Sequence, residues 1–249
     1  MFVKPKLAAT VILLRNRELD LRSGDDCEFE VFMAKRHENA RFMNEHHVFP
    51  GGGIDKQDLN KKSRARLVGI DEKVIDDLKE ICEDPAYLWI IAIRELFEET
   101  GILIATCKTR ESYYSIEEKS KKLKKYQKSL QKRRKTMTEI LIKENLYYDA
   151  NSLKYFGRFI TPKLSPIRFD TQFFLCKFPQ NQNINLFSSE LTEGLWASPK
   201  QYLEQHKKKQ IKLIFPQYST LQRLQKFKTI EEVFNSSKNV SSRNRLNDF

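Results

Sequence analysis

The stretch from Asp84 to Ile102 constrains the fold of this chain more than any other. Asp84 can cap a helix and Pro85 suits its first position, while Gly101 suits the left-handed residue just past a helix end. These signals predict a helix of about four turns. Apolar residues cover most of its circumference, so we expect it to pack inside the protein. They form two neighbouring stripes: Leu88, Ala92 and Leu96, and Trp89, Ile93 and Phe97.

The last two turns of this helix carry three glutamates. Glu95, Glu98 and Glu99 are separated by three and four positions, which places their carboxylates on one helix face. Like charges so placed repel each other, and on a buried helix cations must neutralise them. Arg94 supplies part of that positive charge. Because carboxylate oxygens are hard ligands, the group predicts a site for Mg²⁺ or Mn²⁺, whereas a solvated acidic edge is the ordinary alternative.

Length and composition suit a globular chain. It has 249 residues, of which 40% are hydrophobic, enough for a sizeable core. We expect one domain over residues 1–234 and a flexible tail over residues 235–249. Bilayer-length apolar runs and a secretory signal pattern are absent, and the last residues, 247–249, read Asn-Asp-Phe rather than a peroxisomal signal. We therefore expect a cytoplasmic location and no membrane partner.

The formal charge of +12 makes the chain attractive to polyanions. A net charge of +7 falls between Glu117 and Glu144, where apolar residues recur at spacings of three, four and seven. This pattern predicts one long amphipathic helix, or two, over residues 115–146. A solvated helix face explains the lysines better than a nucleic-acid site, so nucleic acid is not the expected partner.

Apolar runs and alternating patterns elsewhere predict strands mixed with helices, which indicates an α/β fold. Pro50 followed by three glycines predicts a loop after the third strand. The expected strands are Leu7 to Leu14, Glu28 to Lys35, His47 to Phe49, Ile102 to Cys107, Phe156 to Pro162, Thr171 to Phe178 and Gly194 to Ala197. The expected later helices are Pro199 to Gln205, Tyr218 to Phe227 and Ile230 to Phe234, with an extended segment from Ile211 to Phe215.

Residues 94–102 read Arg-Glu-Leu-Phe-Glu-Glu-Thr-Gly-Ile, which resembles the second half of the Nudix box. That box opens with Pro-Gly-Gly after a strand, as residues 50–52 do here. The resemblance implies the Nudix fold, an α/β/α sandwich with a mixed sheet, here with helical insertions. It also implies that the Gly52 carbonyl joins the three glutamates around the metal, while Arg94 orients them.

The chain departs from the common Nudix pattern in one place. Gly52 and Arg94 are 42 positions apart, about 28 more than in the family motif. We expect the insertion, roughly residues 58–83, to add a helix outside the core. Ala86 replaces the glutamate that normally lies eight positions before the arginine. Asp58, six positions after Gly52, is a candidate substitute to which the sequence assigns no role.

A second resemblance concerns the substrate. Residues 158–162 and 165–174, together with Ala40 to Met43 ahead of the glycine run, look like the long-insertion coenzyme A diphosphatases of the Nudix family. Such enzymes split coenzyme A or acyl-coenzyme A into 3′,5′-ADP and the phosphopantetheine portion. Arg36, Arg168 and Asp170 are the candidate substrate-binding residues. For the last two, a strand entry pinned by an Arg and Asp pair is an equal alternative.

The resemblance implies hydrolysis of a diphosphate link in a small nucleotide substrate. Glu98 and Glu99 hold the metal, and Glu95 completes its shell or accepts a proton from the attacking water. Which carboxylate is the base stays open, as does the oligomeric state. One alternative keeps the chemistry with ADP-ribose, NADH or a dinucleoside polyphosphate as substrate. Another is an inactive Nudix domain that serves as an RNA-binding or regulatory module, with Lys119 to Lys135 as its basic surface.

Overall fold

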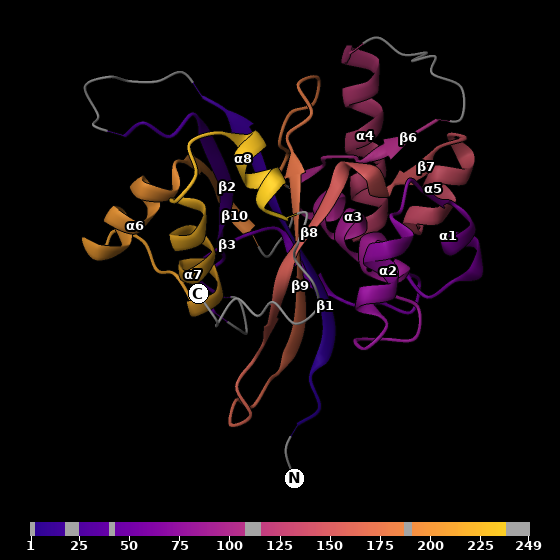
Figure 1. Cartoon of the computed structure of the whole chain (residues 1–249). Coiled ribbons are helices and arrows are strands. Elements are labelled where there is room, and N and C mark those ends of the chain that lie inside the picture. The colour runs from indigo at the N-terminus through magenta and orange to yellow at the C-terminus, as the bar shows by residue number, and fades with distance from the viewer. Residues whose placement is uncertain (1–2, 18–24, 40–42, 108–115, 187–190, 238–249) are drawn as a thin grey trace.

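The computed structural model describes residues 3–17, 25–39, 43–107, 116–186 and 191–237 (Figure 1). Its elements in chain order are β1 Lys6–Asn16, β2 Phe29–Arg36, β3 His47–Val48, β4 Gly51–Gly53, α1 Lys61–Ala65, β5 Leu67–Val68, α2 Glu72–Leu78, α3 Ala86–Thr100, β6 Ala105–Thr106, α4 Ile116–Gln131, α5 Met137–Lys143, β7 Tyr147–Asp149, the 3-10 turn η1 Ala150–Ser152, β8 Leu153–Ile160, β9 Phe169–Lys177, β10 Leu191–Ala197, α6 Pro199–Lys207, α7 Phe215–Leu224 and α8 Ile230–Ser236.

A seven-stranded mixed sheet forms the centre of the molecule. Its main path runs β10-β2-β1-β9-β8, while β3 pairs with β2 and β4 pairs with β1. The central pair, β1 with β9, is parallel, and the remaining pairs are antiparallel. Seven consecutive residues of β1 are buried, as expected for a strand covered on both faces.

Helices cover the two faces of this sheet. Val11 and Leu13 of β1 pack into the core that contains α3, whereas Ile12 and Leu14 point into a second core beneath α6, α7 and α8. Figure 1 shows α3 and the inserted helices on one side of the strands and α6 to α8 on the other. The arrangement confirms the predicted α/β/α sandwich with a mixed sheet. The other predicted strand segments coincide with β2, β3, β8, β9 and β10.

The predicted core helix is α3. Its apolar side chains are buried around most of its circumference, and the Trp89 indole donates to the Leu153 carbonyl at 3.4 Å. The helix begins at Ala86, one residue later than expected, because Pro85 takes the cap position. The Asp84 carboxylate still accepts the Ala86 N–H at 3.1 Å. At the other end Gly101 has φ of 73°, the left-handed conformation that closes a helix.

The insertion over residues 58–83 differs from the prediction of one helix outside the core. It forms α1, β5 and α2, and Leu67, Ile75 and Leu78 are buried against the core around α3. Strand β5 pairs in parallel with β7, while β6 pairs with β7 on its other side. The prediction was wrong because the apolar residues of the insertion have a buried surface to pack on, which their spacing alone does not reveal.

The insertion over residues 115–146 forms two helices, α4 and α5, separated by a turn. Thr136 and Glu139 make a reciprocal capping box that begins α5. The apolar stripe covers the domain itself: Tyr126, Leu130, Met137 and Leu141 are all buried in the core around α3. Residue 115 lies outside the described residues.

Three boundary predictions need correction. The segment predicted as a strand from Ile102 narrows to β6, and Phe215, expected in an extended segment, begins α7. Asn235 and Ser236, expected in the tail, belong to α8. Residues 238–249, like Ala40 to Phe42, lie outside the described residues. Across the described ranges, the helices are too short or too polar to cross a bilayer.

Candidate active site at the end of helix α3

The glycine run forms strand β4 rather than the predicted loop. It lies antiparallel to β1, with Gly52 opposite Ala9. The Gly51 N–H donates to the Glu99 Oε2 at 2.9 Å. A Cβ on Gly52 would lie 2.5 Å from Glu95 Oε1, so the absence of a side chain there lets the carboxylate reach the backbone. The structure therefore brings Glu95, Glu99 and Gly52 together, as the resemblance implied.

Arg94 lies at the centre of the acidic group. Its Nη2 is 2.9 Å from Glu95 Oε1 and its Nη1 is 3.1 Å from Glu98 Oε2, while Nη2 also donates to the Gly53 carbonyl at 3.0 Å. Burial opposes the charge of Arg94, but Glu95, Asp58 and Glu98 outweigh it and raise the pKa of the guanidinium. Arg94 is therefore a permanent cation that ties two carboxylates to the glycine strand.

Asp58 supplies the contact that the sequence left without a role. Its carboxylate accepts from Arg94 at two points, Nε at 2.7 Å and Nη2 at 3.0 Å, and both side chains are buried. Asp58 also accepts the Asp55 N–H at 2.8 Å. It thus pairs with Arg94, which the uncharged Ala86 side chain cannot do. The useful signal was its place six positions after Gly52, at the start of the insertion.

Burial changes the acidity of Glu95. Its side chain is 14% exposed, and this burial raises the pKa of Glu95 to about 7; the Glu98 charge acts in the same direction and the Arg94 charge opposes both. A carboxyl group with such a pKa exchanges a proton near neutral pH, which suits a general base. The Glu98 side chain is more exposed to solvent than that of Glu95.

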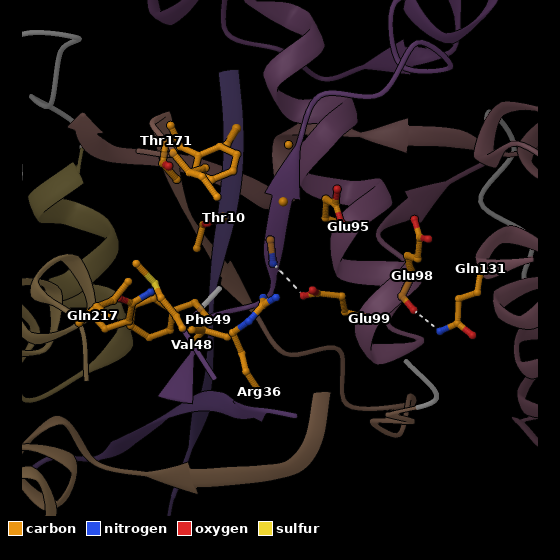
Figure 2. A pocket seen from close by; sticks show the side chains of 18 of the residues that line it. Thr10, Arg36, Val48, Phe49, Glu95, Glu98, Glu99, Gln131, Thr171 and Gln217 are labelled. Atoms are coloured by element: carbon orange, nitrogen blue, oxygen red, sulfur yellow. Dashed lines mark hydrogen bonds between the residues drawn. The ribbon is translucent and has the colours of Figure 1, made fainter. Parts of the chain in front are cut away.

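The donor types at this centre fit a hard divalent cation. Glu95 packs against the Gly52 backbone, while Glu99 extends toward the glycine strand and Glu98 lies on the side of Gln131 (Figure 2). All three offer hard carboxylate oxygens. Protein groups already contact these carboxylates, however. Arg94 pairs with both Glu95 and Glu98, and the Gly51 N–H donates to Glu99. Among the described residues, no three acidic, imidazole or thiol groups are gathered as a ready metal shell.

The carboxylates open into a cavity of about 690 Å³. This volume is typical of sites for small-molecule ligands. In Figure 2, Arg36 lies on the glycine-strand side of Glu99, and Gln131 lies beyond Glu98. The lining residues are Ala8, Thr10, Arg36, Met43, Val48, Phe49, Gly51, Gly52, Gly53, Glu95, Glu98, Glu99, Gln131, Arg133, Ile167, Phe169, Thr171, Ile214 and Gln217.

Of the three candidate substrate residues, the structure places only Arg36 in the lining of this cavity. Arg168 is buried and donates to the carbonyls of Thr161 at 3.0 Å and Val3 at 2.7 Å. Asp170 accepts two hydrogen bonds from Arg158, at 2.8 and 2.6 Å. Arg168 and Asp170 therefore hold the start of β9 in place, which is the alternative given above. The partner of Asp170 is Arg158, however, and not Arg168.

Several cavity residues were not found from the sequence, among them Gln131, Arg133 and Gln217. Gln131 and Arg133 come from the end of α4 and the turn after it, and Gln217 comes from α7. The Gln217 side-chain oxygen is buried without a hydrogen-bond partner in the described part of the chain. The basic run around Arg133 was visible in the sequence, but neither its spacing nor its composition shows which surface it faces.

The sandwich and the carboxylate centre define a Nudix protein, and comparison with known proteins agrees. The family model of the NUDT19 Nudix domain matches residues 61–224. The chain belongs to that branch of the Nudix hydrolase family.

Curated relatives include the acyl-coenzyme A diphosphatase NUDT19 of Xenopus laevis, 26% identical over 236 residues that cover 83% of this chain and 62% of the relative. The human protein of the same name is 23% identical, with 82% of this chain and 63% of the relative covered. The chain thus spans about three fifths of the length of these relatives.

A solved Nudix hydrolase from Alicyclobacillus acidocaldarius has the same fold. It matches with a TM-score of 0.69 over 96% of this chain and 97% of its own, at 24% identity.

Proposed function

We propose that this chain is a metal-dependent hydrolase that cleaves the diphosphate link of coenzyme A or acyl-coenzyme A, giving 3′,5′-ADP and phosphopantetheine or its acyl form. The observation that carries the proposal is the joint placement of Glu95, Glu98, Glu99 and the Gly52 backbone in one cavity. The relatives named acyl-coenzyme A diphosphatase support the choice of substrate.

Mg²⁺ or Mn²⁺ would be held by Glu98, Glu99 and the Gly52 carbonyl, and Glu95 would either complete this shell or act as the base. When bound, such an ion neutralises diphosphate charge and lowers the pKa of a bound water. The donor set supports this assignment, since every group in it offers a hard oxygen.

The protein side of the reaction is positioning and charge balance, as is general for phosphoryl and diphosphate chemistry. Arg94 holds Glu95 and Glu98 in place, and Asp58 holds Arg94. Glu95 is the candidate base, because its raised pKa lets it accept a proton from water near neutral pH. Arg36, which lines the cavity on the other side of Glu99, faces the negative charge of the diphosphate.

The two ends of the cavity suit the two ends of coenzyme A. Val48, Phe49 and Gln217 lie together on one side of the cavity (Figure 2), which suits the pantetheine arm with its amide groups. Gln131 lies on the other side, beyond Glu98, and its polar amide suits the nucleotide portion.

A substrate panel with added Mg²⁺ or Mn²⁺, read by product mass, tests this proposal. The panel contains coenzyme A, an acyl-coenzyme A, ADP-ribose, NADH and a dinucleoside polyphosphate. We expect 3′,5′-ADP and phosphopantetheine from coenzyme A, and loss of product when the metal is chelated. If coenzyme A stays intact while ADP-ribose is cleaved, the substrate assignment is wrong although the chemistry holds.

The Glu98→Gln variant tests the mechanism. We expect kcat on coenzyme A to fall by about 100-fold or more, because the change removes a metal-ligand charge at nearly constant shape. Glu72→Gln, at an exposed position that begins α2, is the matched control and should keep wild-type turnover. Wild-type turnover in Glu98→Gln, with both variants folded by circular dichroism, would contradict the proposed centre.

A further inference from the structure

The turn that ends α4 places an arginine where glycine is normally preferred. Arg133 has φ of 52°, and the Arg133 N–H donates to the Leu130 carbonyl at 2.8 Å while the Arg134 N–H donates to the Ser129 carbonyl at 2.8 Å. These two bonds define a Schellman motif with Arg133 at its left-handed position. A residue with a Cβ is less stable there than glycine, by about 1 kcal/mol. Arg133 therefore adopts the left-handed conformation at some cost to the stability of the folded protein.

This turn is attached to the carboxylate helix. Gln131 Nε2 donates to the Glu98 carbonyl at 2.7 Å, and Gln127 Nε2 donates to the same carbonyl at 3.2 Å. Gln127 is fully buried and also donates to the Asn185 carbonyl at 2.8 Å. The end of α4 is thus fixed to the end of α3, so the position of Arg133 relative to Glu98 does not depend on a loose loop.

Arg133 lines the same cavity as the carboxylates, and it is exposed to solvent. Figure 2 shows Gln131, two residues earlier, beyond Glu98, whereas Arg36 lies on the opposite side of the carboxylates. Arg36 and Gln131 therefore lie on opposite sides of the carboxylates, and Arg133 follows Gln131 by two residues in the same cavity lining. A substrate group that extends past Glu98 on the side of Gln131 would approach the turn that carries Arg133.

A guanidinium in this position suits a phosphate monoester. Its planar fork matches two phosphate oxygens, and such charge-assisted bonds are the strong ones. The carboxylate centre is itself negative, so a further phosphate near it needs a cation of its own.

We propose that Arg133 binds a phosphate monoester that the substrate carries beyond its diphosphate, and thereby selects 3′-phosphorylated nucleotides. The inference rests on the proposed function for the identity of the reaction. It goes beyond that function in assigning a specificity residue to the turn after α4. Under this assignment Arg133 distinguishes coenzyme A from dephospho-coenzyme A, which differ by that phosphate.

Lys209 provides a matched control within the same chain. It follows α6 with φ of 59°, and the Lys209 N–H donates to His206 and the Gln210 N–H to Gln205, both at 2.9 Å, in the same Schellman pattern. Lys209 does not line the cavity. A basic residue at this type of helix end also interacts favourably with the helix dipole, and Lys209 shares that effect. Any difference between the effects of substituting Arg133 and Lys209 therefore comes from the cavity position of Arg133 and not from the turn conformation.

The experiment compares Arg133→Gly and Lys209→Gly in the whole chain. Glycine adopts the left-handed conformation without the steric cost of a Cβ, so we expect both variants to have thermal midpoints equal to or above that of the wild type. In Arg133→Gly, the ratio of kcat/KM for coenzyme A to that for dephospho-coenzyme A should fall about 10- to 100-fold, mainly through KM, because one charged hydrogen-bonding partner is lost. Arg133→Lys should recover part of the ratio, and Lys209→Gly should keep it.

Calorimetric binding of 3′,5′-ADP and of AMP gives a readout that needs no turnover. The wild type should bind 3′,5′-ADP more tightly than AMP, and Arg133→Gly should lose that preference. If the wild type shows no preference, or Arg133→Gly retains it, the assignment of Arg133 is wrong even when coenzyme A is hydrolysed. If coenzyme A is not hydrolysed, the proposed function fails, and the binding comparison still decides the role of Arg133.

Discussion

The Asp58 carboxylate and the Arg94 guanidinium form a two-point ion pair, with Oδ1 2.7 Å from Nε and Oδ2 3.0 Å from Nη2, across 36 positions of sequence. Neither side chain is more than 4% exposed. The insertion between them folds back so that its first residues stay beside the glycine strand. The pair therefore joins the two separated halves of the Nudix motif.

Replacing Asp58 with Asn should destabilise the protein by about 3 kcal/mol, because the buried Arg94 charge loses its two-point carboxylate partner. Urea unfolding measures this change. Asp76→Asn removes a partner of Lys79 at the exposed surface and should leave the midpoint unchanged. Equal midpoints for the two variants would show that Asp58 does not balance the Arg94 charge.

Replacing Gly52 with Ala should disrupt the carboxylate centre. The new Cβ would lie 2.5 to 2.8 Å from the Glu95 carboxylate atoms, so Glu95 must move away from the backbone and from Arg94. We expect Mn²⁺ affinity, measured by calorimetry, to fall about 10-fold or more. Gly53→Ala is the control, since its Cβ meets nothing closer than 3.8 Å. Wild-type Mn²⁺ affinity in Gly52→Ala would mean that metal binding does not depend on the close contact between Glu95 and the Gly52 backbone.

Stability of the metal-free protein should depend on the protonation of Glu95. Burial raises the pKa of Glu95 from 4.5 to about 7, so the folded state binds this proton more tightly than the unfolded state. The resulting stabilisation is complete below about pH 4.5 and is lost as the pH rises through about 7. Relative to Glu95→Gln in chelator, the wild type should lose up to about 3 kcal/mol over this range. A difference that stays constant from pH 4.5 to 7.5 would contradict the raised pKa.

The insertion over residues 58–83 should contribute to the stability of the whole domain. Leu78 is fully buried in the core around α3, so Leu78→Ala should cost about 2–5 kcal/mol in the free energy of unfolding. Leu59, which is 52% exposed, gives the control: Leu59→Ala should change it by less than about 0.5 kcal/mol. A small effect at Leu78 would restore the view that the insertion lies outside the core.

Local patterns predicted most of the sheet and the helix that carries the glutamates. The continuous apolar run that became β1 and the capping signals of α3 act over a few neighbouring residues, so they are visible in the sequence. The packing of the insertion over residues 58–83 was harder to predict. An amphipathic sequence shows which of its faces is buried, but not which part of the protein that face packs against.

What the sequence by itself determined is the spacing of Glu95, Glu98 and Glu99, which any helix turns into three carboxylates on one side, and the glycine that leaves room for one of them. Only the tertiary structure decided the partners. It paired Asp58 with Arg94, drew Asp170 to Arg158 in the sheet, and brought Arg133 into the cavity. The physical reason is range: helix geometry relates residues three or four apart, whereas charge pairing depends on how distant segments pack.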